Sequence, residues 1–333
     1  MEGRIHPEIA ILEEISARLG ANPLLVQAGS GNTSIKLGGI LWIKASGKWL
    51  AHAGQEDIFV PVGVAAMRDC VGRGVDLAKH WEATGRRLRP SIETAMHAVI
   101  PHRAVIHVHS VNTIAWAVRR DGQARCAERL AGLAWQWVPY VPSGLPLARQ
   151  VAKCLAKAPE TRVLVLGNHG LVVCGEDCQA AEAALQEVEN RLAIQPRRAP
   201  QPNRAILEQQ IAAAPGWVLP DQEAVHSLAT DSVARTTLQG GILYPCQAIF
   251  LGTNARMAPH WIVGHSGVIV SRSANQAEQE MLRGLAEVVQ RIDGDADLRY
   301  LTRAELARVL TQEAQQYRGL VQRSAVQARV AIA

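Results

Sequence analysis

Two histidines separated by a single residue, His107 and His109, are the sharpest chemical signal in the sequence. The β-branched residues of segment 103–109 predict a strand there. Because side chains alternate between the two faces of a strand, both imidazoles should point to the same face. Such a pair could begin a metal site, but a hydrogen-bonded pair of surface histidines would give the same pattern.

A third imidazole comes from His169, which lies in the segment Gly167-Asn168-His169-Gly170. This segment reads as a tight turn between two apolar strands, so the side chain is presented at a strand end. Three histidines with an open fourth position are typical of catalytic zinc, whereas structural zinc favours a closed set that includes cysteines. Taken alone, a histidine in such a turn is more often an ordinary turn residue than a metal ligand.

A carboxylate, Glu93, precedes His107 by fourteen residues in the segment Pro90-Ser91-Ile92-Glu93. This segment is predicted to begin a helix over 91–100. A glutamate in a first helical turn is explained by its favourable interaction with the helix dipole. A role in proton transfer therefore needs support from its neighbours.

Two turns, at 29–34 and 45–48, are rich in glycine, serine and threonine. Such turns expose backbone N–H groups and hydroxyls and can bind a phosphate or another oxyanion. Ordinary turns have the same composition. Neither a Walker loop nor a dinucleotide-binding fingerprint is present.

In their order along the chain, these segments resemble the class II aldolase/adducin family. The resemblance covers roughly residues 6 to 193. It rests on Gly31-Asn32-Thr33-Ser34-Ile35-Lys36, Lys44-Ala45-Ser46-Gly47, Pro90-Ser91-Ile92-Glu93, His107-Val108-His109 and Asn168-His169-Gly170. Within that family, the segments 32–36 and 42–47 look most like the bacterial aldolases related to rhamnulose-1-phosphate aldolase.

The resemblance implies an α/β fold with three layers, α/β/α, around a central and mainly antiparallel sheet. It also implies a homotetramer with active sites at the subunit interfaces and one Zn²⁺ per chain. The implied zinc ligands are His107, His109 and His169, with Glu93 as the catalytic acid and base. The positions implied to bind the substrate phosphate are Asn32, Ser46, Gly47 and Ser91.

The expected reaction is that of a zinc-dependent aldehyde-lyase acting on a ketose or sugar acid, with a phosphorylated substrate preferred. Bond cleavage would proceed through a metal-stabilised enediolate. Decarboxylation, epimerisation or dehydration of a sugar-acid phosphate are alternatives on the same fold. A non-catalytic interaction module like adducin needs no metal, and the intact set of three histidines and a glutamate argues against it.

Two positions depart from the family pattern. Ile92 stands where the family usually has a second serine, so one phosphate hydroxyl is missing. The tyrosine that protonates the leaving aldehyde in fuculose-phosphate aldolases has no clear counterpart, because segment 118–134 contains no tyrosine. Tyr140 is the nearest candidate for this proton donor.

The elements that must position these residues follow from periodicity and turn signals. Helices are predicted over 6–19, 91–100, 111–118, 145–157, 179–192, 204–213, 221–228, 274–292 and 302–317. Strands are predicted over 34–37, 40–44, 58–62, 103–109, 135–141, 162–166, 171–174, 248–251 and 267–271. Thr302 is the expected N-cap of the last helix, with Glu305 completing a capping box.

Three prolines in segment 195–203 mark a linker between an aldolase-like domain, 1–194, and a C-terminal α/β extension, 204–333. The role of the extension is open. Its Tyr244, His260 and His265 could reach the site, but packing and subunit contacts explain them more simply.

Composition limits the class of protein. The 333 residues are 48% hydrophobic and 20% charged, which excludes a mainly disordered chain. No apolar run approaches the ~18 residues needed to cross a bilayer. Segment 1–19 carries four glutamates and does not resemble a secretory signal, so a cytoplasmic location is expected. The net charge of +5 is scattered, and with 8 Trp, 4 Tyr and 2 Phe a nucleic-acid partner is not expected.

Overall fold

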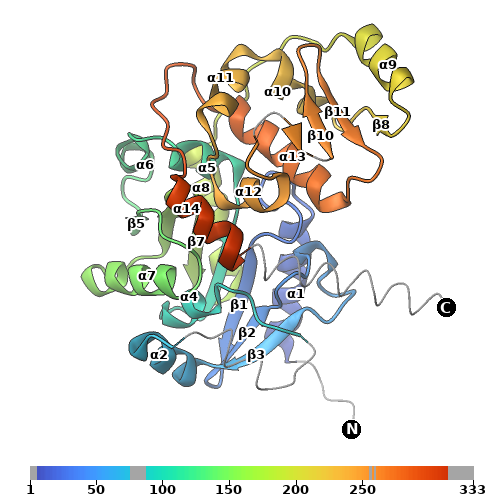
Figure 1. Ribbon diagram of the computed structural model, residues 1–333. Coiled ribbons are helices and arrows are strands. Elements are labelled where there is room, and N and C mark those ends of the chain that lie inside the picture. The colour runs from blue at the N-terminus through green and yellow to red at the C-terminus, as the bar shows by residue number, and fades with distance from the viewer. Residues whose placement is uncertain (1–5, 76–87, 255–256, 259, 314–333) are drawn as a thin grey trace, which may run out of the picture.

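The computed structural model describes residues 6–75, 88–254, 257–258 and 260–313 of the chain. These residues form a seven-stranded sheet in the N-terminal part and a four-stranded sheet in the C-terminal part, each accompanied by helices (Figure 1). The protein is therefore of the α/β class, as predicted.

The central sheet has the strand order β3-β2-β1-β4-β7-β6-β5. Neighbouring strands are antiparallel except β5 and β6, which are parallel. Its strands are β1 (Asn32–Leu37), β2 (Ile40–Lys44), β3 (Phe59–Gly63), β4 (Ala104–Val108), β5 (Trp135–Val138), β6 (Val163–Leu166) and β7 (Gly170–Gly175). The predicted, mainly antiparallel sheet is confirmed.

Helices cover both faces of this sheet. One face packs on α1 (Pro7–Gly20), α5 (Val111–Ala117), α6 (Gly122–Arg129) and α8 (Cys178–Leu192). The other packs on α2 (Val64–Arg73), α4 (Thr94–Val99) and α7 (Leu145–Lys157). A 3-10 turn, η1 (Leu50–His52), lies beside α1.

The alternation of side chains along β4 shows how the sheet separates these two layers. Ile106 and Val108 belong to the apolar cluster under α1 and α8, whereas Val105 belongs to the cluster under α4 and α7. His107 follows the same period of two and shares the face of Val105. The three-layer α/β/α arrangement is thus confirmed, and α4 lies on the face to which His107 points.

The C-terminal part builds a smaller sheet with the order β8-β11-β10-β9. Its strands are β8 (Trp217–Val218), β9 (Met257–Ala258), β10 (Trp261–Val263) and β11 (Val268–Ser271). Its helices are α9 (Arg204–Ala213), α10 (Ser227–Thr230), α11 (Ser232–Gly240), α12 (Pro245–Leu251), α13 (Gln276–Gln290) and α14 (Arg303–Arg308), with a 3-10 turn η2 (Glu223–His226). In Figure 1, α12 lies between this part and the seven-stranded sheet.

The structure corrects the prediction of a strand over 248–251, because these residues end helix α12. An apolar run of four residues does not distinguish a strand from a buried helical segment. The signal that was missed is Pro245 in the first turn, a position that tolerates proline because its N–H would have no helical partner. Tyr244, in extended conformation, is the N-cap.

Two further helices are shorter or more broken than predicted. The region 221–228 contains η2 followed by α10 rather than one helix. The capping box of Thr302 and Glu305 is confirmed, but α14 ends at Arg308 and continues as a π-helical turn over Val309–Glu313. The remainder of the predicted helix, to 317, lies outside the described residues.

The two parts of the chain share an apolar cluster. Ile114 and Val118 of the α5 region pack with Leu282 and Leu285 of α13. Residues 193–203 between the parts form neither helix nor strand. The division into two domains with a linker at 195–203 remains a prediction. In the structure, the extension packs against helix α5, which covers the seven-stranded sheet.

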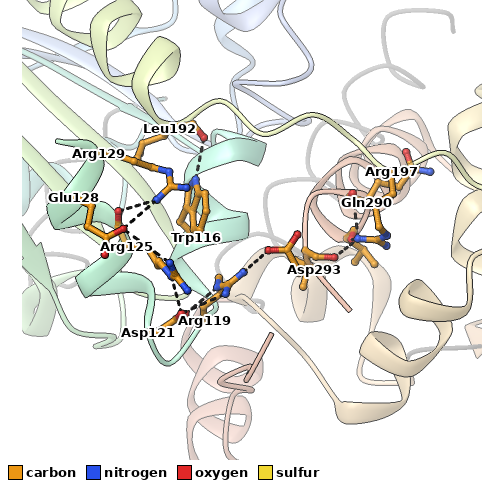
Figure 2. Close-up of polar contacts among 12 residues, drawn as sticks. Trp116, Arg119, Asp121, Arg125, Glu128, Arg129, Leu192, Arg197, Gln290 and Asp293 are labelled. Atoms are coloured by element: carbon orange, nitrogen blue, oxygen red, sulfur yellow. Dashed lines mark hydrogen bonds and ion pairs between the residues drawn. The ribbon is translucent and has the colours of Figure 1, made fainter. Parts of the chain in front are cut away.

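Polar contacts reinforce this junction (Figure 2). Arg119, at the end of α5, pairs with Asp121 at 2.9 Å and with Asp293, just after α13, at 2.9 Å. Arg197 in the connecting segment donates its backbone N–H to the carbonyl of Gln290 at 2.9 Å. The ion pair between Arg119 and Asp293 and the backbone hydrogen bond between Arg197 and Gln290 therefore anchor the end of α13 to the rest of the chain.

Within the residues that the structure describes, no helix is long and apolar enough to cross a membrane.

Candidate metal centre

The three predicted histidines meet at one point. His107 lies near the end of β4, His109 follows that strand directly, and His169 lies in the turn between β6 and the adjacent β7. All three are buried, and one ring nitrogen of each lies within 4.8 Å of those of the others. The Nε2 atoms of His107 and His109 are 3.2 Å apart. Strands β4 and β7 are neighbours in the sheet but lie more than fifty residues apart in the chain, and their pairing brings the three histidines into a single cluster.

Hydrogen bonds orient the rings. His107 Nδ1 donates to the carbonyl oxygen of Leu171, 2.9 Å away, which leaves the Nε2 lone pair facing the cluster. His109 Nδ1 lies 3.5 Å from Cys246 Sγ, so its Nε2 also faces inward. Fixing one ring nitrogen in this way is how proteins set the tautomer of a metal-binding imidazole.

The turn that carries His169 is held by unusual backbone geometry. Asn168 adopts a left-handed conformation, with φ of 51°. Gly170 approaches β4 so closely that a Cβ there would lie 2.6 Å from the carbonyl oxygen of Val108. The residues on both sides of His169 therefore suit this turn, because asparagine tolerates positive φ and only glycine permits the close approach.

Asn168 also ties this turn to the C-terminal part. Its Nδ2 donates to the carbonyls of Leu243 and Arg299, both at 2.8 Å. Its Oδ1 accepts from Arg299 Nη1 at 3.0 Å. Since Asn168 is fully buried, these three bonds fix the position of the neighbouring His169 relative to the extension.

Glu93 completes the cluster. The structure corrects its predicted place in the first turn, because Glu93 is the N-cap residue of α4 and makes no side-chain capping bond. Its carboxylate turns instead toward the histidines, with Oε1 3.2 Å from His169 Nε2 and Oε2 3.3 Å from His107 Nε2. Asn32 Nδ2 donates to Oε2 at 2.7 Å. A helix-dipole explanation for Glu93 is thus replaced by direct contact with two histidines.

Burial and mutual charge decide the protonation of this cluster. Burial lowers the pKa of His107 and, together with the neighbouring histidines, holds the pKa of His109 well below its usual range. Burial alone would raise the pKa of Glu93, but His107 and His169 outweigh it and hold that pKa low. Neutral imidazole is the metal-binding form of histidine. The ring nitrogens of His107, His109 and His169, together with one carboxylate, fit a divalent cation.

The cluster opens into a cavity of about 120 Å³. The phosphate-binding positions predicted from the sequence all line it, together with the acid/base candidate and two of the histidines. These residues are Asn32, Ser46, Gly47, Ser91, Glu93, His109 and His169. Proximity in one cavity is thus established for them, while their individual roles remain predictions.

The predicted proton donor lies elsewhere. Tyr140 is not among the residues that line this cavity. It packs in an apolar cluster with Ile242 and Leu301, and the guanidinium of Arg299 lies 5.1 Å from its ring centre. The catalytic role of Tyr140 stays a prediction.

The three extension residues that could have reached the site do not line the cavity either. Tyr244 is buried in the cluster shared with α13, and His260 pairs with Glu278 at 2.8 Å. His265 is likewise outside the lining.

Sequence reasoning missed Lys44, the last residue of β2. It is only 2% exposed, and its ammonium donates to the carbonyls of Gly29 and Lys48, both at 2.7 Å. It thereby joins the two glycine-rich turns and lines the cavity between them. Burial lowers its pKa to about 7 although nearby Glu93 favours the charged form. One signal in the sequence could have identified Lys44, because it lies in the same motif as Ser46 and Gly47. That motif supported the family resemblance, but no role was assigned to Lys44 itself.

Known proteins are similar to about half of the chain. The Bacillus subtilis protein called uncharacterized oxidoreductase YuxG is 29% identical over 191 residues, which are 51% of this chain and 27% of that protein. The L-fuculose phosphate aldolase of Methanococcus maripaludis is 26% identical over 173 residues, 49% of this chain and 83% of that enzyme. The methylthioribulose-1-phosphate dehydratase of Bacillus pumilus is 30% identical over 181 residues, 48% of this chain and 78% of that enzyme.

The chain thus spans only about a quarter of the length of the first of these relatives. Residues 13–195 match the family described as Class II Aldolase and Adducin N-terminal domain. That segment contains the whole seven-stranded sheet, the three histidines and Glu93. The chain belongs to the class II aldolase and adducin family.

Proposed function

We propose that this protein is a zinc-dependent aldehyde-lyase that cleaves a phosphorylated ketose or sugar acid through an enediolate. The observation that carries the proposal is the carboxylate of Glu93, which lies within 3.3 Å of two of the three clustered histidines and faces the cavity. His107, His109 and His169 would hold one Zn²⁺ per chain. Bound zinc would act as a Lewis acid that polarises a substrate carbonyl and its neighbouring hydroxyl.

Glu93 is suited to move a proton at the carbon beside that carbonyl. Its carboxylate is buried beside the histidines and is therefore shielded from water. Asn32 donates to one carboxylate oxygen, and Ser143 Oγ lies 3.5 Å from the other. These contacts hold the carboxylate in one orientation, which efficient general acid–base catalysis requires.

The substrate phosphate would lie against the two glycine-rich turns. Ser46, Gly47 and Ser91 offer hydroxyl and backbone donors there, and the Lys44 ammonium supplies positive charge. Asn32 has a different part in this arrangement, because its Nδ2 already donates to Ser91 Oγ at 3.1 Å and to Glu93. Its Oδ1 has no partner among the described residues and could accept a hydrogen bond from a substrate hydroxyl.

A dehydratase is the second candidate. It is favoured by the similarity to a methylthioribulose-1-phosphate dehydratase and by the position of Tyr140 outside the cavity, which leaves the lyase reaction without its expected proton donor. Loss of water from a ketose phosphate would begin with removal by Glu93 of the proton on the carbon beside the carbonyl, whereas cleavage would break the carbon–carbon bond first and end with a proton returned to that carbon. Decarboxylation and epimerisation share the enediolate with these reactions. The tetrameric assembly and cytoplasmic location expected from the sequence remain predictions.

The test is a product analysis on zinc-loaded protein. NMR should show two carbonyl fragments from a ketose phosphate if the protein is a lyase, and a dehydrated ketone if it is a dehydratase. Glu93→Gln should retain zinc and lose turnover, whereas the exposed Glu14→Gln serves as matched control and should change neither. Full zinc occupancy in His107→Ala, His109→Ala and His169→Ala variants would contradict the metal assignment.

A further inference from the structure

Helix α12 of the extension presents one apolar face to the cavity. Its residues at the first, second, fifth and sixth helical positions, Pro245, Cys246, Ile249 and Phe250, line the cavity. This spacing places them on one side of a helix. Ala248 and Leu251 on the other side are buried against the rest of the extension.

Polar contacts fix the position of this apolar face of α12 relative to the histidines. Leu243, just before α12, donates its N–H to Gln247 Oε1 at 2.8 Å and accepts from Asn168 Nδ2 through its carbonyl. Cys246 Sγ lies 3.5 Å from His109 Nδ1. The apolar face therefore has a fixed place beside two of the three metal-ligand candidates.

The lining of the cavity consequently has two chemically different parts. One part holds the Lys44 ammonium, which has three N–H donors but, among the described residues, only the two carbonyl partners of Gly29 and Lys48. The other part is the apolar face of α12. A sugar with hydroxyls along its whole length would bury some of them against this face without hydrogen-bond partners, which is unfavourable.

We infer that helix α12 selects a substrate that carries an anionic group at one end and an apolar substituent at the other. The anion lies at Lys44 and the glycine-rich turns, and the apolar substituent contacts Ile249 and Phe250. The inference rests on the proposed function for the place of the anion, and it assigns to the extension the choice of substrate.

Calorimetric titration of the zinc-loaded, full-length protein with inorganic phosphate and with methyl, ethyl, propyl and butyl phosphate tests the inference. A parallel series from acetate to pentanoate distinguishes a phosphate from a carboxylate as the preferred anion. Burial of each methylene should tighten binding by up to about fourfold in the preferred series. Ile249→Asn and Phe250→Ser should each flatten this dependence but leave inorganic phosphate or acetate binding unchanged. The exposed Ile206→Asn is the matched control and should keep the wild-type dependence.

Lack of chain-length dependence in both series would overturn the inference, as would an unchanged dependence in both α12 variants. These outcomes are separate from the fate of the proposed reaction. A protein that shows the dependence yet cleaves and dehydrates no ketose phosphate would refute the proposed function alone. A protein that turns over a ketose phosphate but binds all alkyl phosphates equally would refute the role of α12 alone.

Discussion

Replacement of Asn168 by alanine should destabilise the protein and weaken metal binding together. The change removes three buried hydrogen bonds, to the Leu243 carbonyl and to two groups of Arg299. At about 0.5–1.5 kcal/mol each, their loss costs about 1.5–4.5 kcal/mol. Alanine at a φ of 51° adds about 1–2 kcal/mol of backbone strain. The free energy of unfolding should therefore fall by about 2.5–6.5 kcal/mol.

Asn168→Gly separates the two contributions, because glycine loses the same hydrogen bonds but adopts positive φ without strain. It should be about 1–2 kcal/mol more stable than Asn168→Ala. The measurement is urea unfolding of the metal-free proteins at one pH. The control is Asn190→Ala, which removes one hydrogen bond on the exposed surface of α8 and should change stability by less than about 0.5 kcal/mol.

Because Asn168 directly precedes His169, loosening the turn should also weaken zinc binding by about 10–100-fold in chelator competition, as is typical for residues that orient metal ligands. An Asn168→Ala protein with wild-type stability and zinc affinity would refute the reasoning. So would a glycine variant less stable than the alanine variant, since that would mean that the left-handed backbone is not a cost at this position.

The remaining predictions concern the turns around the cavity. Lys44 has a pKa of about 7 in the folded protein against an ordinary value of 10.5, so the unfolded chain binds more protons between these values. The free energy of unfolding, measured with urea, should therefore rise with pH across that window and level off below pH 7. Lys44→Met should remove the part of this rise that comes from Lys44. An identical dependence of the unfolding free energy on pH in the variant would contradict the prediction. Ile92 lines the cavity, and Ile92→Ser should tighten phosphate binding, measured by calorimetry, by roughly ten- to hundredfold if the new hydroxyl donates to the phosphate. Strong preference of the wild-type protein for a free sugar over its phosphate would defeat the phosphate assignment. Gly170→Ala should lower the melting temperature because the added Cβ would collide with the Val108 carbonyl. The control is Gly216→Ala, which should leave the melting temperature unchanged because no atom lies within 4 Å of the added Cβ. Equal melting temperatures of the two variants would show that the turn can move aside at no cost.

The sequence by itself determined the features that depend on short-range backbone geometry. His107 and His109 had to share a face because strand side chains alternate with a period of two, and they do. Thr302 and Glu305 form the predicted capping box because its partners are three residues apart. The ordered motifs were also sufficient to indicate the family and its three-layer fold, since each motif requires particular residue types in a local turn or strand.

Only the tertiary structure decided what surrounds those residues. Asn168 contacts groups 75 and 131 residues away, and no local pattern encodes such partners. Helix α12 was mistaken for a strand, because four apolar residues fit either element until packing selects one. The same packing brought an apolar face of the extension to the cavity that Lys44 lines, and it turned Glu93 from the helix end toward the histidines. Periodicity is set by bonded neighbours, whereas the chemistry of the cavity is set by which distant surfaces are buried together.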